Sequence, residues 1–151
     1  MFSYNLTPGI DVAKTTDISW EKLCEGPNGE VWILSKCAKE LEKLKQPELR
    51  AKALANMRKR FCKFEDLADL TPSQFKLNEG RQKHEGKEVM VSAFKGGDLR
   101  IYGSVGTVKG NRAFFATHAI YKKANKLDTN DAKLAVRRLV SGISEIPGAQ
   151  I

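Results

Sequence analysis

The residues of this chain that could perform chemistry are concentrated between Lys95 and Arg138. This stretch holds ten basic side chains against three acidic ones, which gives +7 of the formal net charge of +8. It contains His118, whose unperturbed pKa suits proton transfer near neutral pH, and Arg100, whose planar fork matches two phosphate oxygens. A charge distribution this uneven indicates a polyanionic partner, such as a nucleic acid, an acidic protein or a membrane surface. The alternative is a solvated basic face without a specific partner.

Several other kinds of site find no support in the sequence. There is no P-loop, no GxGxxG, no HExxH and no GxSxG motif. The two histidines, His84 and His118, are far apart and no cluster of cysteines or acids joins them, so we expect neither a metal nor a cofactor. The three cysteines, Cys24, Cys37 and Cys62, have no paired spacing. We interpret them as small buried or semi-buried hydrophobes, rather than reactive thiols, in a protein of the reducing cytoplasm.

The elements that must position the basic residues fit into one domain. A chain of 151 residues, 41% of them hydrophobic and 29% charged, can bury a core and is too apolar to be disordered. We interpret residues 1–30, which carry turn residues around one short helix at 18–24, as an N-terminal extension packed on a domain at 31–151. Neither a signal peptide nor an apolar run of the ~20 residues needed for a membrane span is visible. A cytoplasmic protein without a membrane partner is therefore expected.

The first half of this domain predicts a strand followed by two helices. Residues 31–34 form an apolar run after a glycine turn, which is typical of a buried strand. Ser35 suits the N-cap of a helix through Lys45, and Pro47 suits the first position of a second helix. Apolar residues at every fourth position give the second helix a buried stripe, made of Leu49, Ala53, Met57 and Phe61. These two helices form an αα-hairpin.

The second half predicts an antiparallel three-strand meander and a C-terminal helix. Residues 71–74 (TPSQ) are typical of a capping box that opens a helical turn, and the polar residues 78–87 indicate a loop. Asp128 is expected to cap a helix over 129–141 that ends at Gly142. The strands are expected at 89–94, 99–105 and 113–121, joined by turns at 95–98 and 109–112. This order of elements predicts an α+β fold with a mostly antiparallel sheet.

Three segments of the second half carry a resemblance to a known family. They are DLRIYG at 98–103, AFFATHAIYKKANK at 113–126 and AVRRL at 135–139. In this order they resemble the RelE/ParE superfamily of bacterial and phage toxins, and most closely its HigB-type, phage Gp49-like branch, over residues 31–140. That branch has an arginine on a central strand, then a strand that ends in a histidine followed by an aromatic residue and a KK-x-x-K tail. The resemblance implies a RelE-like fold for the domain.

The resemblance also implies the toxin of a type II toxin–antitoxin system. Such a toxin is a metal-independent endoribonuclease that cleaves translated mRNA at the ribosome and is neutralised by a cognate antitoxin protein. RNA can be cut by its own 2′-OH attacking the adjacent phosphate, so the protein must move protons and stabilise the charged phosphorane. Two alternatives remain open: a non-catalytic ParE-like toxin that blocks a topoisomerase, and an inactive phage-derived relative.

Carried over residue by residue, the resemblance assigns catalytic roles to four side chains. Arg100 would stabilise the phosphate, His118 would act as acid or base, and Tyr121 and Lys122 would complete the set. The RNA-binding candidates are Lys95, Tyr102, Lys123, Lys126 and, in the loop before the sheet, Arg81, Lys83 and His84. Each has a structural alternative: an ion pair across the sheet for the arginine, a half-buried strand position for the histidine, a core position for the tyrosines and a solvated tail for the lysines.

Overall fold

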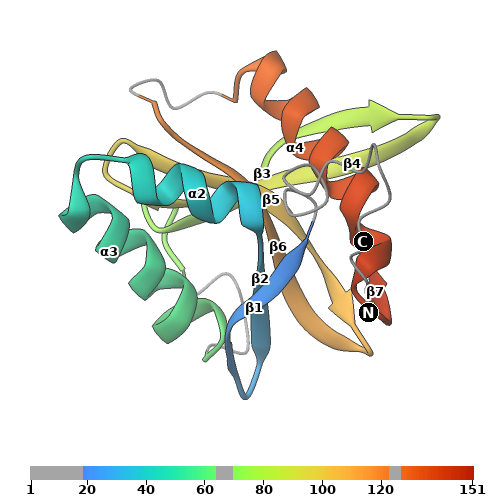
Figure 1. Cartoon of the computed structure of the whole chain (residues 1–151), viewed down its shortest axis with the longest axis horizontal. Coiled ribbons are helices and arrows are strands. Elements are labelled where there is room, and N and C mark those ends of the chain that lie inside the picture. Colours follow the sequence, from blue (N-terminus) through green and yellow to red (C-terminus); the bar gives the residue numbers. More distant parts are fainter. Residues whose placement is uncertain (1–18, 64–69, 123–126) are drawn as a thin grey trace, which may run out of the picture.

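One mixed sheet separates the helices of the chain into two layers (Figure 1). The computed structural model describes residues 19–63, 70–122 and 127–151. The strands lie in the order β1-β2-β6-β5-β4-β3, and β7 pairs with the end of β5. Neighbouring strands are antiparallel except β2 and β6, which are parallel. The strands are β1 (Trp20–Gly26), β2 (Gly29–Leu34), β3 (Phe75–His84), β4 (Lys87–Gly96), β5 (Leu99–Val108), β6 (Asn111–Tyr121) and β7 (Ala149–Gln150).

The two faces of this sheet are covered by different helices. One face packs against α2 (Ser35–Lys43), α3 (Pro47–Ala55) and the π-helical turn η1 (Asn56–Phe61). The other packs against α4 (Thr129–Gly142) and the short 3-10 helix η3 (Ile143–Glu145), as Figure 1 shows. The prediction of an α+β fold with a mostly antiparallel sheet and a C-terminal helix is confirmed. Within the described ranges, no helix has the length and apolar composition that a membrane crossing requires.

Four phenylalanine rings form the centre of the core under α3. Phe61 comes from η1, and Phe75, Phe94 and Phe114 come from β3, β4 and β6. Every pair among the four is in ring contact, with centroids 4.5 to 6.2 Å apart. Strand residues whose side chains point to the other face of the sheet pack against α4 and form a second core with it. This core includes Tyr102 and Phe115 from the sheet and Ala135, Val136 and Leu139 from α4.

An ion pair covers the edge of β6 beyond the point where β2 ends. The parallel register stops at Ile33 opposite Ala116, so the following residues of β6 lack a strand neighbour on that side. Glu40 of α2 fills this place, and its Oε1 accepts hydrogen bonds from Ala119 N at 3.2 Å and from Arg138 Nη1 at 3.0 Å. The same Nη1 donates to the carbonyl oxygen of Thr117 at 3.0 Å. The open backbone groups of the strand are thereby bonded, as buried backbone requires.

Local sequence signals predicted most of these elements. The strand at 31–34, the αα-hairpin and the three strands of the meander are confirmed, and each meander strand is longer than predicted. The turns after Gly96 and Val108 lie where they were expected. Asp128 caps α4, because its Oδ1 accepts a hydrogen bond from Asn130 N at 2.7 Å. Ser35 is the first residue of α2 and not its cap, which is Leu34.

Two segments differ from the prediction, and in both the cause is a β-bulge. The helix expected at 18–24 is wrong, because β1 begins at Trp20. Its register with β2 shifts between Lys22 and Cys24. The apolar residues Trp20, Leu23 and Cys24 therefore have the three- and four-residue spacing that is typical of an amphipathic helix. β1 and the start of β2 therefore place residues 20–30 inside the sheet, while residues 1–18 lie outside the described chain.

The loop expected at 78–87 is wrong as well, because β3 runs from Phe75 to His84. This strand lies at the edge of the sheet and its side chains are mostly polar and solvated, so it lacks the apolar alternation of a central strand. A register shift between Lys76 and Gly80 breaks the remaining pattern. The capping box closes only one turn: Gln74 Oε1 accepts a hydrogen bond from Thr71 N at 3.1 Å, and the strand follows immediately.

Gly96 allows α3 to lie directly on the end of β4. A Cβ atom built at this position would overlap the carbonyl oxygen of Leu49 and approach Ala53 N to 3.1 Å. A glycine is required where a helix backbone and a strand come this close. The first turns of α3 are therefore fixed beside the β4–β5 hairpin, next to the strand ends that carry Lys95 and Arg100.

Candidate functional site

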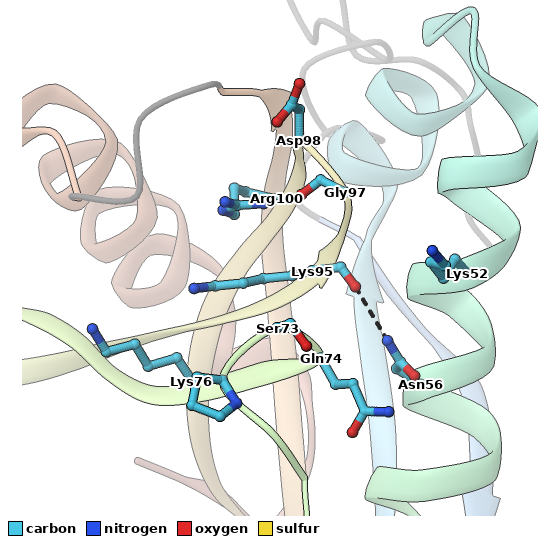
Figure 2. Close-up of a pocket in the computed structure, with 10 residues that line it drawn as sticks. Lys52, Asn56, Ser73, Gln74, Lys76, Lys95, Gly97, Asp98 and Arg100 are labelled. Carbon is cyan, nitrogen blue, oxygen red and sulfur yellow. Dashed lines mark hydrogen bonds between the residues drawn. The ribbon is translucent and has the colours of Figure 1, made fainter.

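A cavity of about 830 Å³ lies at the end of the β4–β5 hairpin (Figure 2). Its walls come from α3 and η1, from the turn before β3, from β3 itself and from the hairpin. Figure 2 shows the side chains of Lys76, Lys95 and Arg100 on one side of the hairpin and those of Lys52 and Asn56 on the other. Among the residues that the structure describes, the lining is Lys52, Asn56, Pro72, Ser73, Gln74, Lys76, Lys95, Gly97, Asp98 and Arg100.

Cations dominate this cavity. Of the lining residues in the described part of the chain, four are basic (Lys52, Lys76, Lys95 and Arg100), and one, Asp98, is acidic. Lys95 and Arg100 are paired directly across β4 and β5, so their side chains leave the same face of the sheet. Two like charges directly opposite each other are unfavourable unless an anion lies between or beside them. An anion at this end of the sheet offsets the repulsion, whether it is a carboxylate of the chain or a bound ligand.

Lys95 is partly neutralised by a residue that the sequence did not single out. Its Nζ lies 2.8 Å from Oε1 of Glu79, and both side chains are buried, with 9% and 2% exposed. Glu79 lies in the bulge of β3, where the register with β4 shifts between Lys76 and Gly80. The backbone of Lys95 is held too, because Asn56 Nδ2 donates to its carbonyl oxygen at 3.1 Å. This lysine is fixed in place, as a positioning residue of the site would be.

Arg100 is held by the hairpin turn itself. Its Nη1 donates hydrogen bonds to the carbonyl oxygens of Gly97 and, at 3.2 Å, of Leu99. The residues directly opposite it on the neighbouring strands are Lys95 and Ile120. The residue is only 5% exposed, and it is one of those that line the cavity. Its guanidinium is thus oriented before any ligand arrives.

His118 lies on the same face as Arg100 but beneath α4. It pairs with Tyr102 across β5 and β6, and Arg100 is the next residue of β5 on that face, roughly 7–8 Å away along the diagonal. His118 Nε2 lies 3.2 Å from Oδ1 of Asp131 in the first turn of α4. The other oxygen of this carboxylate accepts from Lys122 Nζ at 2.9 Å. One carboxylate therefore joins the histidine to the lysine.

The protonation of His118 and Tyr102 is set by burial. Burial lowers the pKa of His118 below its ordinary value, and although the hydrogen bond to Asp131 acts in the opposite direction, it does not offset the loss of solvent. Burial, followed by the charge of Asp131, raises the pKa of Tyr102 to about 12. The two rings stack at 5.1 Å between centroids. Both are neutral near pH 7, and His118 is only 2% exposed.

The stability of the protein is expected to fall in mildly acidic solution because of His118. Its pKa is lower in the folded than in the unfolded chain, so between these two values only the unfolded chain binds the proton. Stability is therefore complete above about pH 6.5 and decreases below it, by at most about 1.4 kcal/mol per pH unit. Urea unfolding between pH 5 and 8 measures this, and His118→Gln should flatten the slope while His84→Gln should not. An equal slope in the His118→Gln variant would contradict the assignment.

Of the two other residues predicted to be catalytic, Tyr121 lies apart from this cluster and Lys122 lies beside it. Tyr121 points to the opposite face, because alternation along β6 separates it from His118, and its hydroxyl accepts a hydrogen bond from Gln46 N at 2.9 Å. Lys122 is brought to the site: besides its bond to Asp131, its backbone N donates to the carbonyl oxygen of Asp98 at 2.7 Å. This contact places the lysine next to the hairpin turn of the cavity.

The remaining RNA-binding candidates are not at the cavity or lie outside the described chain. Arg81 and Lys83 are exposed on β3, where Arg81 pairs with Glu88 at 3.3 Å. His84 ends the same strand, at the far end of β4, roughly 25 Å from the cavity by the rise of a strand. Lys123 and Lys126 are outside the described residues.

Sequence reasoning missed four residues of the site: Lys52, Lys76, Glu79 and Asp131. Lys52 lies on the polar side of a helix, where a lysine is ordinarily solvated. The sequence did offer a signal for Asp131, since an acid in the first turn of a helix that follows a basic strand end favours contact with that strand's side chains.

No protein-family model matches the chain, and no curated protein or solved structure matches it at a significant level.

Proposed function

We propose that this chain is an endoribonuclease of the RelE/HigB type, and that the cavity at the β4–β5 hairpin binds the phosphate at which RNA is cut. The observation that carries the proposal is the excess of cations around the cavity. Even with Glu79 counted beside Asp98, four cations stand against two carboxylates. The sequence resemblance supplies the class of reaction, and the order strand, helical hairpin, antiparallel meander and helix is compatible with it. The resemblance also supplies the biological setting, a toxin held inactive by an antitoxin.

The cavity suits a phosphodiester better than a single carboxylate. Arg100 can bind two phosphate oxygens with its fork, and Lys76 points to the same side of the hairpin. Lys52 approaches from α3 and can contact a neighbouring phosphate. An extended polyanion that passes the hairpin end would therefore meet cations from α3, β3 and β5 in turn. RNA presents such a row of phosphates together with the 2′-OH that the reaction needs.

The chemistry follows from what each described group can do. The 2′-hydroxyl gives its proton to solvent water as its oxygen attacks the adjacent phosphorus, and the bond from phosphorus to the 5′-oxygen then breaks. The extra negative charge that develops falls on phosphate oxygens that Arg100 can hold. The leaving 5′-oxygen needs a proton, and we assign its donation to Lys122, whose backbone N bonds the hairpin turn and whose Nζ lies 2.9 Å from Asp131 Oδ2. We assign His118 a positioning role, because it is buried and holds the carboxylate of Asp131, which in turn holds Lys122.

One observation favours the non-catalytic alternative, a ParE-like protein that blocks a topoisomerase. His118, the residue that the resemblance implies as acid or base, is covered by α4 and is only 2% exposed. A binding protein does not need an accessible proton-transfer group, whereas the cationic cavity would serve it equally well by receiving acidic side chains. The two functions differ in whether RNA is cut.

The test is a cleavage assay with the full chain, performed with free mRNA in a metal chelator and, separately, with mRNA on translating ribosomes in the magnesium buffer that ribosomes need. We expect products with 2′,3′-cyclic or 3′-phosphate ends, because the 2′-oxygen is the nucleophile. DNA of the same sequence is the matched control: it offers the same phosphates without the 2′-OH, so it should bind but stay intact. RNA binding should weaken with salt, with a log–log slope of about −2 for three phosphate contacts. A strict need for magnesium would contradict this chemistry, and intact RNA with a blocked topoisomerase would support the alternative.

A further inference from the structure

The sulfur atoms of two cysteines from distant parts of the chain are in contact. Cys24 lies on β1 and Cys62 follows η1 directly, and their Sγ atoms are 3.7 Å apart. Both are free thiols, and Cys37 is buried elsewhere in the core. The interpretation of the three cysteines as small buried or semi-buried hydrophobes agrees with their positions, because Cys37 and Cys62 are buried and Cys24 is partly buried, but it did not foresee this contact. A disulfide, with an S–S distance of about 2.05 Å, needs a further approach of less than 2 Å.

The two segments are held together independently of the sulfur atoms. Asn28, in the turn between β1 and β2, donates its backbone N to the carbonyl oxygen of Cys62 at 2.9 Å and its Nδ2 to that of Lys63 at 2.8 Å. Gly26 lies on the same side of β1 as Cys24, and a Cβ atom there would come within 2.8 Å of the carbonyl oxygen of Cys62. The absence of a side chain at Gly26 lets the end of η1 lie on β1. The thiols therefore face each other at high effective concentration.

The two thiols differ in access and in acidity. Cys24 is partly exposed, whereas Cys62 is only 1% exposed. The hydrogen bond with Cys62 and the charge of Arg58 lower the pKa of Cys24, against the effect of burial. The same hydrogen bond, together with burial, raises the pKa of Cys62. Cys24 is thus the thiol that becomes a nucleophilic thiolate and can be reached by a small molecule.

We propose that Cys24 and Cys62 form a redox-modification site that reacts with low-molecular-weight disulfides such as oxidised glutathione. The Cys24 thiolate attacks one sulfur of the reagent, forms a mixed disulfide and releases one glutathione thiolate. The Cys62 thiol loses its proton and attacks Sγ of Cys24, which breaks the mixed disulfide and releases the second glutathione. The chain loses two electrons and two protons, and the reagent gains them as two thiols. The product links β1 to the end of η1.

The test uses the full reduced chain in glutathione buffers of increasing oxidised fraction, followed by alkylation and peptide mass spectrometry. We expect one intramolecular disulfide between the peptides of Cys24 and Cys62, and a melting temperature raised by roughly 5–15 °C, because the new link closes a loop across 38 residues. Before oxidation, Cys24 should react with a thiol reagent at least about tenfold faster than the buried Cys37.

Three single variants separate this pair from unspecific oxidation. Cys37→Ser should still form the disulfide. Cys62→Ser should stop at the mixed disulfide on Cys24, because the resolving thiol is gone, and Cys24→Ser should stay unmodified at position 62. A disulfide that includes Cys37, a disulfide between two chains, or thiols that remain reduced in oxidised glutathione would each overturn the proposal. A variant that fails to fold is replaced by the valine or alanine variant at the same position, for which the same outcomes apply.

Discussion

Replacement of Arg100 by alanine is expected to lower the rate of RNA cleavage by about 100-fold or more. The carbonyl oxygens of Gly97 and Leu99 orient the guanidinium in advance, so under the proposed function it would meet the charge that develops on the phosphate oxygens without reorganisation. Removal of one such pre-oriented donor typically costs about 10²–10³ in rate. Single-turnover cleavage of one RNA substrate measures the loss. Arg100→Lys keeps the charge but not the fork, and should recover only a small part of the rate.

Arg81→Ala is the matched control for this experiment. It removes the same charge from an exposed position on β3, on a side chain paired with Glu88 far from the cavity, and should leave the cleavage rate nearly unchanged. Because Arg100 also bonds the hairpin turn, the folded fraction of each variant must be measured by its melting curve. A folded Arg100→Ala protein that cuts RNA at the parent rate would exclude this residue from the reaction.

Replacement of Phe114 by alanine is expected to lower the free energy of unfolding by about 3–5 kcal/mol, the usual cost of removing a buried aromatic ring. Phe114 is fully buried and contacts Phe61, Phe75 and Phe94, with centroids 6.2, 6.2 and 4.8 Å away. The lost ring leaves a cavity between the sheet and η1, which these neighbours can fill only in part. Urea unfolding at pH 7.5, where His118 does not contribute, measures the change.

Two further variants bracket this result. Phe114→Leu keeps much of the volume and should cost clearly less than the alanine variant. Leu77→Ala removes a similar apolar side chain from a position that is 41% exposed, so it should change the stability by no more than about 0.5 kcal/mol. If Phe114→Ala lost less than about 1 kcal/mol, the four rings could not be the centre of this core.

The parts of the fold that the sequence predicted are those that depend on local signals. The apolar run at 31–34, Pro47 at the start of a helix and Asp128 as a cap each act within a few residues, so the sequence contains the complete cause. β1 and β3 depend on their neighbours instead. Each has a bulge, and each is stabilised by pairing with a strand rather than by its own pattern, so the periodicity of its side chains is misleading.

The residues of the candidate site likewise fall into those that local signals predicted and those that depend on tertiary packing. Arg100 and Lys95 could be placed together, because a two-residue turn joins their strands and fixes the register. His118 and Lys122 follow from the alternation along β6, which also explains why Tyr121 faces away. Residues brought in by tertiary packing had no such signal: Lys52 and Asp131 come from helices, and Glu79 comes from a bulge. The contact between Cys24 and Cys62 depends on how η1 lies on β1, which no spacing records.

The ion pair between Glu40 and Arg138 has a consequence for the cooperativity of unfolding. It joins residues 98 positions apart, one on the helix layer of each face, and both bind the backbone of β6 between them. The amide hydrogen of Ala119 can therefore exchange with solvent only when Glu40 moves away from the strand, and that movement deprives Arg138 of its carboxylate. Opening of α2 is thereby coupled to loosening of α4, so the amides of the two layers should belong to one exchange unit rather than two independent ones.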